Sequence, residues 1–176
     1  MKPLRVRRTQ GVLLLTLDTP GSPVNIFDVP AARQVVEAME QAERDGTRAV
    51  VFQSAKPDSF LNGARLMSLY SAGKSPHTSQ DLGLLSAAYE AVRNSRVLTV
   101  AAIRGNCYGC GLEFALTCKA RVAADTRDTH FYLTELKDYL LLPAFGSMRA
   151  LPPAGRLARR GGPAHRRPEV VRAAGL

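Results

Sequence analysis

The most constraining feature of this sequence is an apolar run that leads through a cluster of glycines into a short helical pattern. Residues 98–103 (LTVAAI) are small, aliphatic or β-branched, which is typical of a buried strand. Three glycines follow within residues 105–111, and a helical pattern begins at 112. Such a junction presents the first backbone N–H groups of the helix to whatever lies above the turn. The segment therefore predicts a strand–turn–helix unit that can hold a negatively charged oxygen.

Strand-like and helix-like segments alternate along the rest of the chain. Strands are predicted at 4–8, 12–18, 48–54, 97–103, 120–124 and near 130–133, and helices at 28–44 (capped by Asp28), 64–71, from Thr78 or Ser79 to 94, and 111–118. This alternation is typical of βαβ units with right-handed crossovers, so the predicted fold class is α/β. Residues 1–151 are expected to form one core domain.

The end of the chain differs in composition from the rest. Seven Arg and one Glu within residues 149–176 account for six of the nine net positive charges. The Pro- and Gly-rich segment 152–176 is expected to be disordered; a truncated or frame-shifted end is the other main explanation. No aromatic residue interleaves with these arginines, which disfavours a nucleic-acid-binding arm. No apolar run approaches the roughly 20 residues that span a bilayer, so no membrane partner is expected.

The three cysteines, Cys107, Cys110 and Cys118, are an odd number clustered in one segment. This is not the pattern of a secreted disulfide framework and favours a reducing cytoplasm. Two other interpretations remain open. One is a redox pair formed by Cys107 and Cys110 before a helix. The other is a zinc site formed by the cysteines with His130, although paired ligand spacing is lacking.

Two acidic residues follow the glycine turns. Glu113 lies in the first turn of the helix after Gly111, and Glu135 follows one further strand. A second turn of the same kind occurs at 60–66 (FLNGARL). Two backbone donors and two carboxylates suit a reaction that makes an enolate from a thioester, because donors hold the oxyanion and carboxylates move protons or water. Alternatively, Glu113 only complements a helix N-terminus, worth roughly 0.3–1 kcal/mol, and Glu135 is an ordinary loop acid.

These motifs resemble the crotonase superfamily, the enoyl-CoA hydratase/isomerase family, from about Gly11 to Leu151. The landmarks that carry the resemblance fall in the family's order: 15–20 with Val24-Asn25-Ile26, then 49–52, Phe60-x-x-Gly63-Ala64, Gly109-x-Gly111-x-Glu113, and Thr134-Glu135 followed by Leu142-Pro143. The resemblance implies a ββα spiral core. Family members continue well beyond residue 151, so it also implies that the C-terminal helical region is missing or altered.

The resemblance assigns roles to individual residues. It implies that the backbone N–H groups of Ala64 and Cys110 form the oxyanion hole and that Glu113 and Glu135 are catalytic. It places coenzyme A and the acyl group against Val24, Asn25, Ile26, Gly63, Ala64, Arg65, Leu66, Gly109 and Gly111. No metal or redox cofactor is implied, because coenzyme A is part of the substrate.

Four departures from the family pattern accompany this resemblance. Cys110 stands where the family usually has glycine, and Arg65 stands where Asp is common; its guanidinium fork would suit a CoA phosphate. Two extra residues occur around Arg127-Asp128, and the 137–139 segment (KDY) replaces a small, glycine-containing turn.

The function implied is that of an enoyl-CoA hydratase, a lyase of fatty acid metabolism, assembled as a trimer-based homo-oligomer. The alternatives are a double-bond isomerase or another acyl-CoA-processing crotonase that uses one Glu, and a catalytically inactive, truncated acyl-CoA-binding member.

Overall fold

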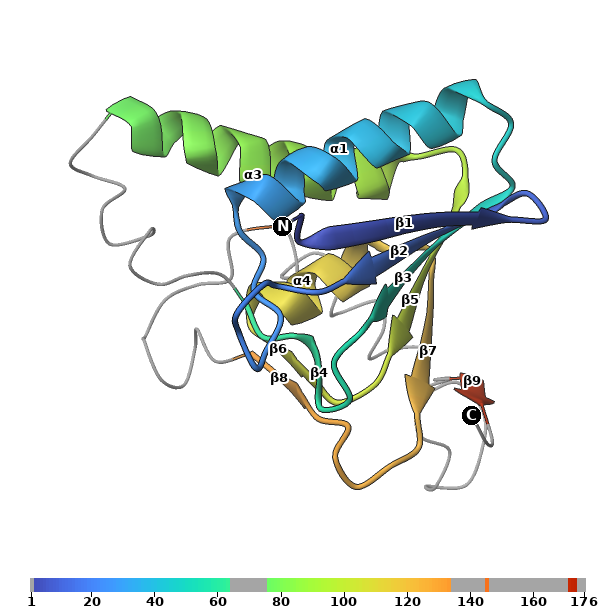
Figure 1. The fold of residues 1–176 in the computed structure, drawn as a ribbon, viewed down its shortest axis with the longest axis vertical. Coiled ribbons are helices and arrows are strands. Elements are labelled where there is room, and N and C mark those ends of the chain that lie inside the picture. The colour runs from blue at the N-terminus through green and yellow to red at the C-terminus, as the bar shows by residue number, and fades with distance from the viewer. Residues whose placement is uncertain (1, 64–75, 134–144, 146–170, 174–176) are drawn as a thin grey trace, which may run out of the picture.

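The strands of the chain separate into a large sheet and a small sheet (Figure 1). The computed structural model describes residues 2–63, 76–133, 145 and 171–173, without side chains at 76–79 and 171–173. The elements are β1 (Leu4–Thr9), β2 (Val12–Leu17), α1 (Val29–Arg44), β3 (Ala49–Ser54), β4 (Ser59–Leu61), α3 (Pro76–Asn94), β5 (Leu98–Ile103), β6 (Asn106–Tyr108), α4 (Cys110–Thr117), β7 (Ala120–Ala124), β8 (Phe131–Tyr132) and β9 (Val171–Ala173).

The large sheet has the order β1-β2-β3-β5-β7-β9, in which β1 is antiparallel to β2 and the other pairs are parallel. Its register aligns Leu15 with Phe52, and Phe52 with Ala101. These three side chains are fully buried and belong to one core cluster, which also takes residues from α1, α3 and α4. Side chains alternate between the two faces of a strand, so these three aligned residues lie on the same face of the sheet. That face is the one that packs against the helices.

Three times along the chain, a strand of the large sheet is followed by a strand of the small sheet. The strands β3, β5 and β7 lie in the large sheet, and the strand that follows each of them lies in the small parallel sheet β4-β6-β8. After β6 the chain enters α4, which Figure 1 shows above the small sheet. This repeated path confirms the α/β class and the ββα spiral expected from the resemblance.

The sequence did not predict β4 or β6 as strands. Each is three residues long, and each directly precedes the glycine turn that dominated the local pattern. The small sheet therefore exists because of pairing between segments far apart in sequence, such as Ser59 with Asn106.

Helix boundaries follow local chemistry. Asp28 caps α1 as predicted, since its Oδ1 accepts a hydrogen bond from the Ala31 N–H at 3.0 Å. The helix α3 begins at Pro76, earlier than the predicted caps at Thr78 or Ser79. Proline suits the first helical position, because the N–H that it lacks would have no partner inside the helix.

The C-terminal segment contributes one strand. Residues Val171–Ala173 form β9, which pairs with β7 through Val122 and Val171. The edge of β7 offers backbone groups that a further strand can pair, and the expectation of disorder over 152–176 stays a prediction. The rest of that segment and the predicted helix at 64–71 lie outside the described residues.

Within the described part of the chain, no helix combines the length and the apolarity needed to cross a bilayer.

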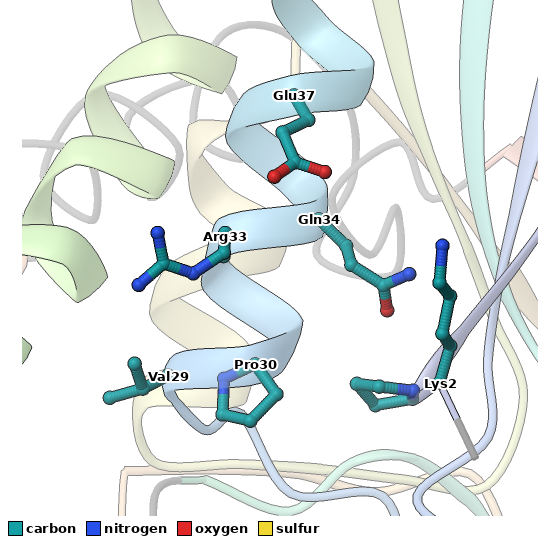
Figure 2. A pocket seen from close by; sticks show the side chains of 7 residues that line it. Lys2, Val29, Pro30, Arg33, Gln34 and Glu37 are labelled. Carbon is teal, nitrogen blue, oxygen red and sulfur yellow. The ribbon is translucent and has the colours of Figure 1, made fainter.

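A surface pocket of about 490 Å³ lies where the start of α1 faces the N-terminal residues (Figure 2). It is lined by Lys2, Pro3, Val29, Pro30, Arg33, Gln34 and Glu37. Among the predicted site residues that the structure describes, none lines this pocket.

Candidate active site

The two glycine turns predicted from the sequence meet where β4 ends and α4 begins. A Cβ atom on Gly63 would lie 3.6 Å from the Tyr108 carbonyl oxygen and 4.0 Å from the Cys110 nitrogen. A Cβ atom on Gly111 would lie only 2.0 Å from the Leu61 carbonyl oxygen. The first turn of α4 therefore packs directly against the end of β4, which only glycine at position 111 allows. Gly63 itself has φ +91°, a conformation that glycine adopts readily.

Cys110 is the first residue of α4, so its N–H is one of the four that have no acceptor within the helix. The buried hydroxyl of Tyr89 donates a hydrogen bond to the Cys110 carbonyl oxygen at 2.7 Å. This bond ties the start of α4 to α3. The backbone of residue 110 thus lies next to Gly63, with the Cys110 nitrogen 4.0 Å from where a Cβ atom on Gly63 would be.

Glu113 is a buried carboxylate one turn along the same helix, with only 1% of its surface exposed. Its N–H donates to the Gly109 carbonyl oxygen at 3.1 Å, and its Oε2 accepts a hydrogen bond from the Phe145 N–H at 2.8 Å. Burying a carboxylate is costly unless hydrogen bonds compensate, so such a group in a site is a candidate for chemistry.

Phe145 is fixed over Glu113 by contacts with α3. Its ring stacks on Tyr89 with centroids 4.3 Å apart and planes 10° apart. The Arg93 guanidinium donates a hydrogen bond to the Phe145 carbonyl oxygen. Sequence reasoning missed this contact, because Phe145 and Arg93 are 52 residues apart and no local pattern links them.

The loop after β2 lies against β4 through Asn25. Both the side chain and the backbone of Asn25 are hydrogen-bonded inside the protein, and its exposed fraction is 0%. Asn25 therefore has no exposed polar atom in this structure, and its assignment to coenzyme A from the resemblance stays a prediction. Its neighbours Val24 and Ile26 are partly exposed.

The cysteines do not have the environment of a redox pair. All three are buried, and none of them forms a disulfide. Burial, together with the nearby Cys118, raises the pKa of the Cys107 thiol, and burial raises the pKa of Cys118 to about 12. Because thiol redox chemistry proceeds through the thiolate, these shifts disfavour the Cys107–Cys110 interpretation.

No group of three or more His, Cys, Asp or Glu side chains that could hold a metal occurs among the described residues. The ring of His130 instead lies 3.3 Å from the Asn106 Oδ1 atom.

The structure thus brings together Gly63, Gly109, Cys110, Gly111 and Glu113. The predicted site residues Ala64, Arg65, Leu66 and Glu135 lie outside the described residues, so their roles stay predictions.

Comparison with known proteins agrees with this geometry. The model of the enoyl-CoA hydratase/isomerase family matches residues 7–158. The chain belongs to this family. The fatty acid oxidation complex subunit alpha of Idiomarina loihiensis is 34% identical over 146 residues, which are 82% of this chain and 20% of that protein. This member of the enoyl-CoA hydratase/isomerase family thus spans about a fifth of that curated relative.

Solved structures show the same fold. Pseudomonas aeruginosa DspI superposes with a TM-score of 0.76 at 30% identity, covering 88% of this chain and 57% of that one. An enoyl-CoA hydratase from Bacillus halodurans superposes with a TM-score of 0.76 at 26% identity, covering 86% of this chain and 61% of that one.

Proposed function

We propose that this chain acts as an enoyl-CoA hydratase, adding water across the C2–C3 double bond of a 2-enoyl-CoA thioester. The observation that carries the proposal is the buried carboxylate of Glu113, placed one helical turn from the contact between Gly63 and the Cys110 nitrogen. A carboxylate beside backbone donors suits a reaction in which a thioester oxygen gains negative charge while a proton moves nearby.

In the proposed mechanism, the thioester oxygen accepts hydrogen bonds from the N–H groups of Ala64 and Cys110. Glu113 orients a water molecule and takes its proton as the water oxygen bonds to C3. Glu135 delivers a proton to C2 as the enolate collapses. One oxyanion donor is worth roughly 3–4 kcal/mol in such reactions, so both turns matter for the rate. The reaction so written needs no metal or redox cofactor.

The geometry at Glu113 supports its role in placing water. The hydrogen bond from the Phe145 N–H to Oε2 fixes the orientation of the carboxylate. The proposal places coenzyme A along Val24, Ile26 and the segment from Gly63 to Leu66. Of these residues, Val24 and Ile26 are partly exposed.

Product analysis on two substrates tests the reaction type. A short 2-enoyl-CoA should lose its conjugated thioester absorbance and give a 3-hydroxyacyl-CoA, whereas a 3-enoyl-CoA should not be converted by the same preparation. The family description covers isomerases too. Conversion of the 3-enoyl-CoA without hydration would replace the hydratase by the isomerase. If a folded chain binds acyl-CoA but converts neither substrate, the proposal fails in favour of a binding protein.

The proposal extends to assembly and location. We expect a trimer-based homo-oligomer, which sedimentation velocity would measure directly. Exposed large apolar side chains, with Val6 at 57% and Leu98 at 46% exposure, are compatible with further contacts. The three cysteines form no disulfide with one another, which suits a reducing cytoplasm.

A further inference from the structure

The side chain of Asn25 is buried at the base of the first glycine turn. Its Nδ2 atom lies 3.2 and 3.1 Å from the carbonyl oxygens of Ser59 and Phe60, in β4, and 2.8 Å from the Ser54 Oγ atom, at the end of β3. Its Oδ1 atom accepts a hydrogen bond from the Thr19 N–H at 3.0 Å. One amide group therefore ties the loop after β2 to the two strands that lead into the turn.

The backbone around Asn25 holds the turn itself. The Asn62 N–H donates to the Asn25 carbonyl oxygen at 2.9 Å, and the Phe27 N–H donates to the Gly63 carbonyl oxygen at 2.8 Å. The Asn25 N–H in turn donates to the Ser59 Oγ atom at 3.0 Å. The bond from Phe27 fixes the Gly63 carbonyl, which is one end of a planar peptide unit.

We propose that Asn25 is the positioning residue for the first oxyanion donor, an inference that rests on the hydratase function proposed above. Asn25 acts through the loop: its amide fixes residues 25–27 against β4, and Phe27 then holds the Gly63 carbonyl. The amide is required because it faces two carbonyl oxygens and a hydroxyl, and only a donor satisfies the carbonyls. A carboxylate of the same shape would repel them.

The substitution Asn25→Asp tests this role, because it keeps the shape of the side chain and removes its donors. Displacing a reacting or stabilising group by about 1 Å can cost on the order of 100-fold in rate. We therefore expect kcat to fall about 10- to 100-fold for the folded fraction, with a smaller change in KM, because oxyanion contacts strengthen in the transition state.

A spectroscopic measurement separates positioning from a merely structural role. Butyryl-CoA labelled with carbon-13 at the thioester carbonyl is bound to the protein, and the carbonyl stretching band is recorded by difference infrared spectroscopy. Hydrogen bonding in the oxyanion hole lowers this frequency. We expect a clear lowering in the native chain and a smaller one in Asn25→Asp.

The matched control is Ser22→Ala, in the same loop. The Ser22 Oγ atom accepts a hydrogen bond from the Val24 N–H at 3.3 Å and, within the described part of the chain, makes no hydrogen bond with residues 25–27. Losing this bond should leave the carbonyl frequency as in the native chain. If Asn25→Asp does not fold, Ser59→Ala replaces it. This variant loses the bonds that Ser59 Oγ makes with the Asn25 N–H and Asn62 Oδ1, and should shift the band in the same direction.

The outcomes distinguish a failure of the positioning role of Asn25 from a failure of the proposed hydratase function. A native carbonyl frequency and native kcat in folded Asn25→Asp would overturn the positioning role while leaving the hydratase intact. The positioning role is likewise overturned if Asn25→Asp does not fold and Ser59→Ala keeps the native frequency. If bound butyryl-CoA shows no lowered frequency even in the native chain, the proposed oxyanion hole itself fails.

Discussion

At the scale of single residues, two glycines in helices have opposite surroundings. Gly111, the second residue of α4, packs against the Leu61 carbonyl oxygen, which a Cβ atom would approach to 2.0 Å. Gly83 in α3 is exposed, with nothing within 4 Å of a Cβ atom. The contact at Gly111 is with backbone, so no side-chain rotation can relieve it.

Alanine at these two positions should therefore change stability in opposite directions. Gly83→Ala should raise the free energy of unfolding by about 0.5–1 kcal/mol, because alanine loses less conformational entropy in a helix. Gly111→Ala should lower it by about 1–3 kcal/mol or more through overpacking. Urea unfolding of both variants measures this, and a Gly111→Ala protein as stable as the native chain would show that α4 does not pack on β4 as described.

Single residues also show where sequence reasoning stops. Glu113 could be predicted because its turn, glycines and helix are adjacent in the chain. The hydroxyl contact of Tyr89 with Cys110 was not predicted, because it depends on how α3 lies over α4. Asn25 was assigned to the substrate, whereas its partners in β3 and β4 lie 29 to 35 residues away in sequence. Partners at such distances leave no local pattern.

At the scale of elements, the end of α1 is joined to β1 by a charged contact. The Arg8 Nη2 atom lies 2.6 Å from Asp45 Oδ2, and Thr47 donates to Oδ1 of the same carboxylate. The hydrogen bond from Arg8, followed by that from Thr47, lowers the pKa of Asp45 well below its usual value of 3.8. Folding therefore favours the ionised form of Asp45.

This shift predicts a pH dependence of stability. A lowered pKa adds stability that is fully present above the unfolded value of 3.8 and is lost as the pH falls through the folded pKa. The native chain should be more stable than Asp45→Asn at pH 7, and the difference should shrink as the pH falls below about 4. Asp58→Asn is the control, since Asp58 is exposed and takes part in no ion pair among the described residues. If the difference in free energy of unfolding between the native chain and Asp45→Asn stays constant from pH 7 to pH 3, this account is contradicted.

Most elements of the large sheet and its helices could be predicted from periodicity. The observed β2, α1, β3, β5 and β7 begin and end within a residue or so of the predicted ranges. The strands β4 and β6 were missed, because three residues carry too little pattern and their pairing is decided by distant segments.

At the scale of the whole molecule, the spiral path explains how the site arises. The passes that end in β4 and β6 are each followed by a glycine turn, at Gly63 and Gly109, and parallel pairing of β4 with β6 places these two turns side by side. The fold and the position of Glu113 were thus accessible from sequence and resemblance together. The hydrogen bond from the Phe145 N–H to Glu113 could not be predicted in this way, since it depends on tertiary packing.

The most direct test of the central claim is the turnover of a short 2-enoyl-CoA by the native chain and by Glu113→Gln. Glutamine keeps the size of the side chain and an oxygen that can accept the Phe145 N–H, so the fold and acyl-CoA binding should persist. Loss of a general base should lower kcat by about 10²- to 10⁴-fold with little change in the dissociation constant for butyryl-CoA. If Glu113→Gln hydrates its substrate at the native rate, Glu113 is not the catalytic carboxylate and the account is wrong.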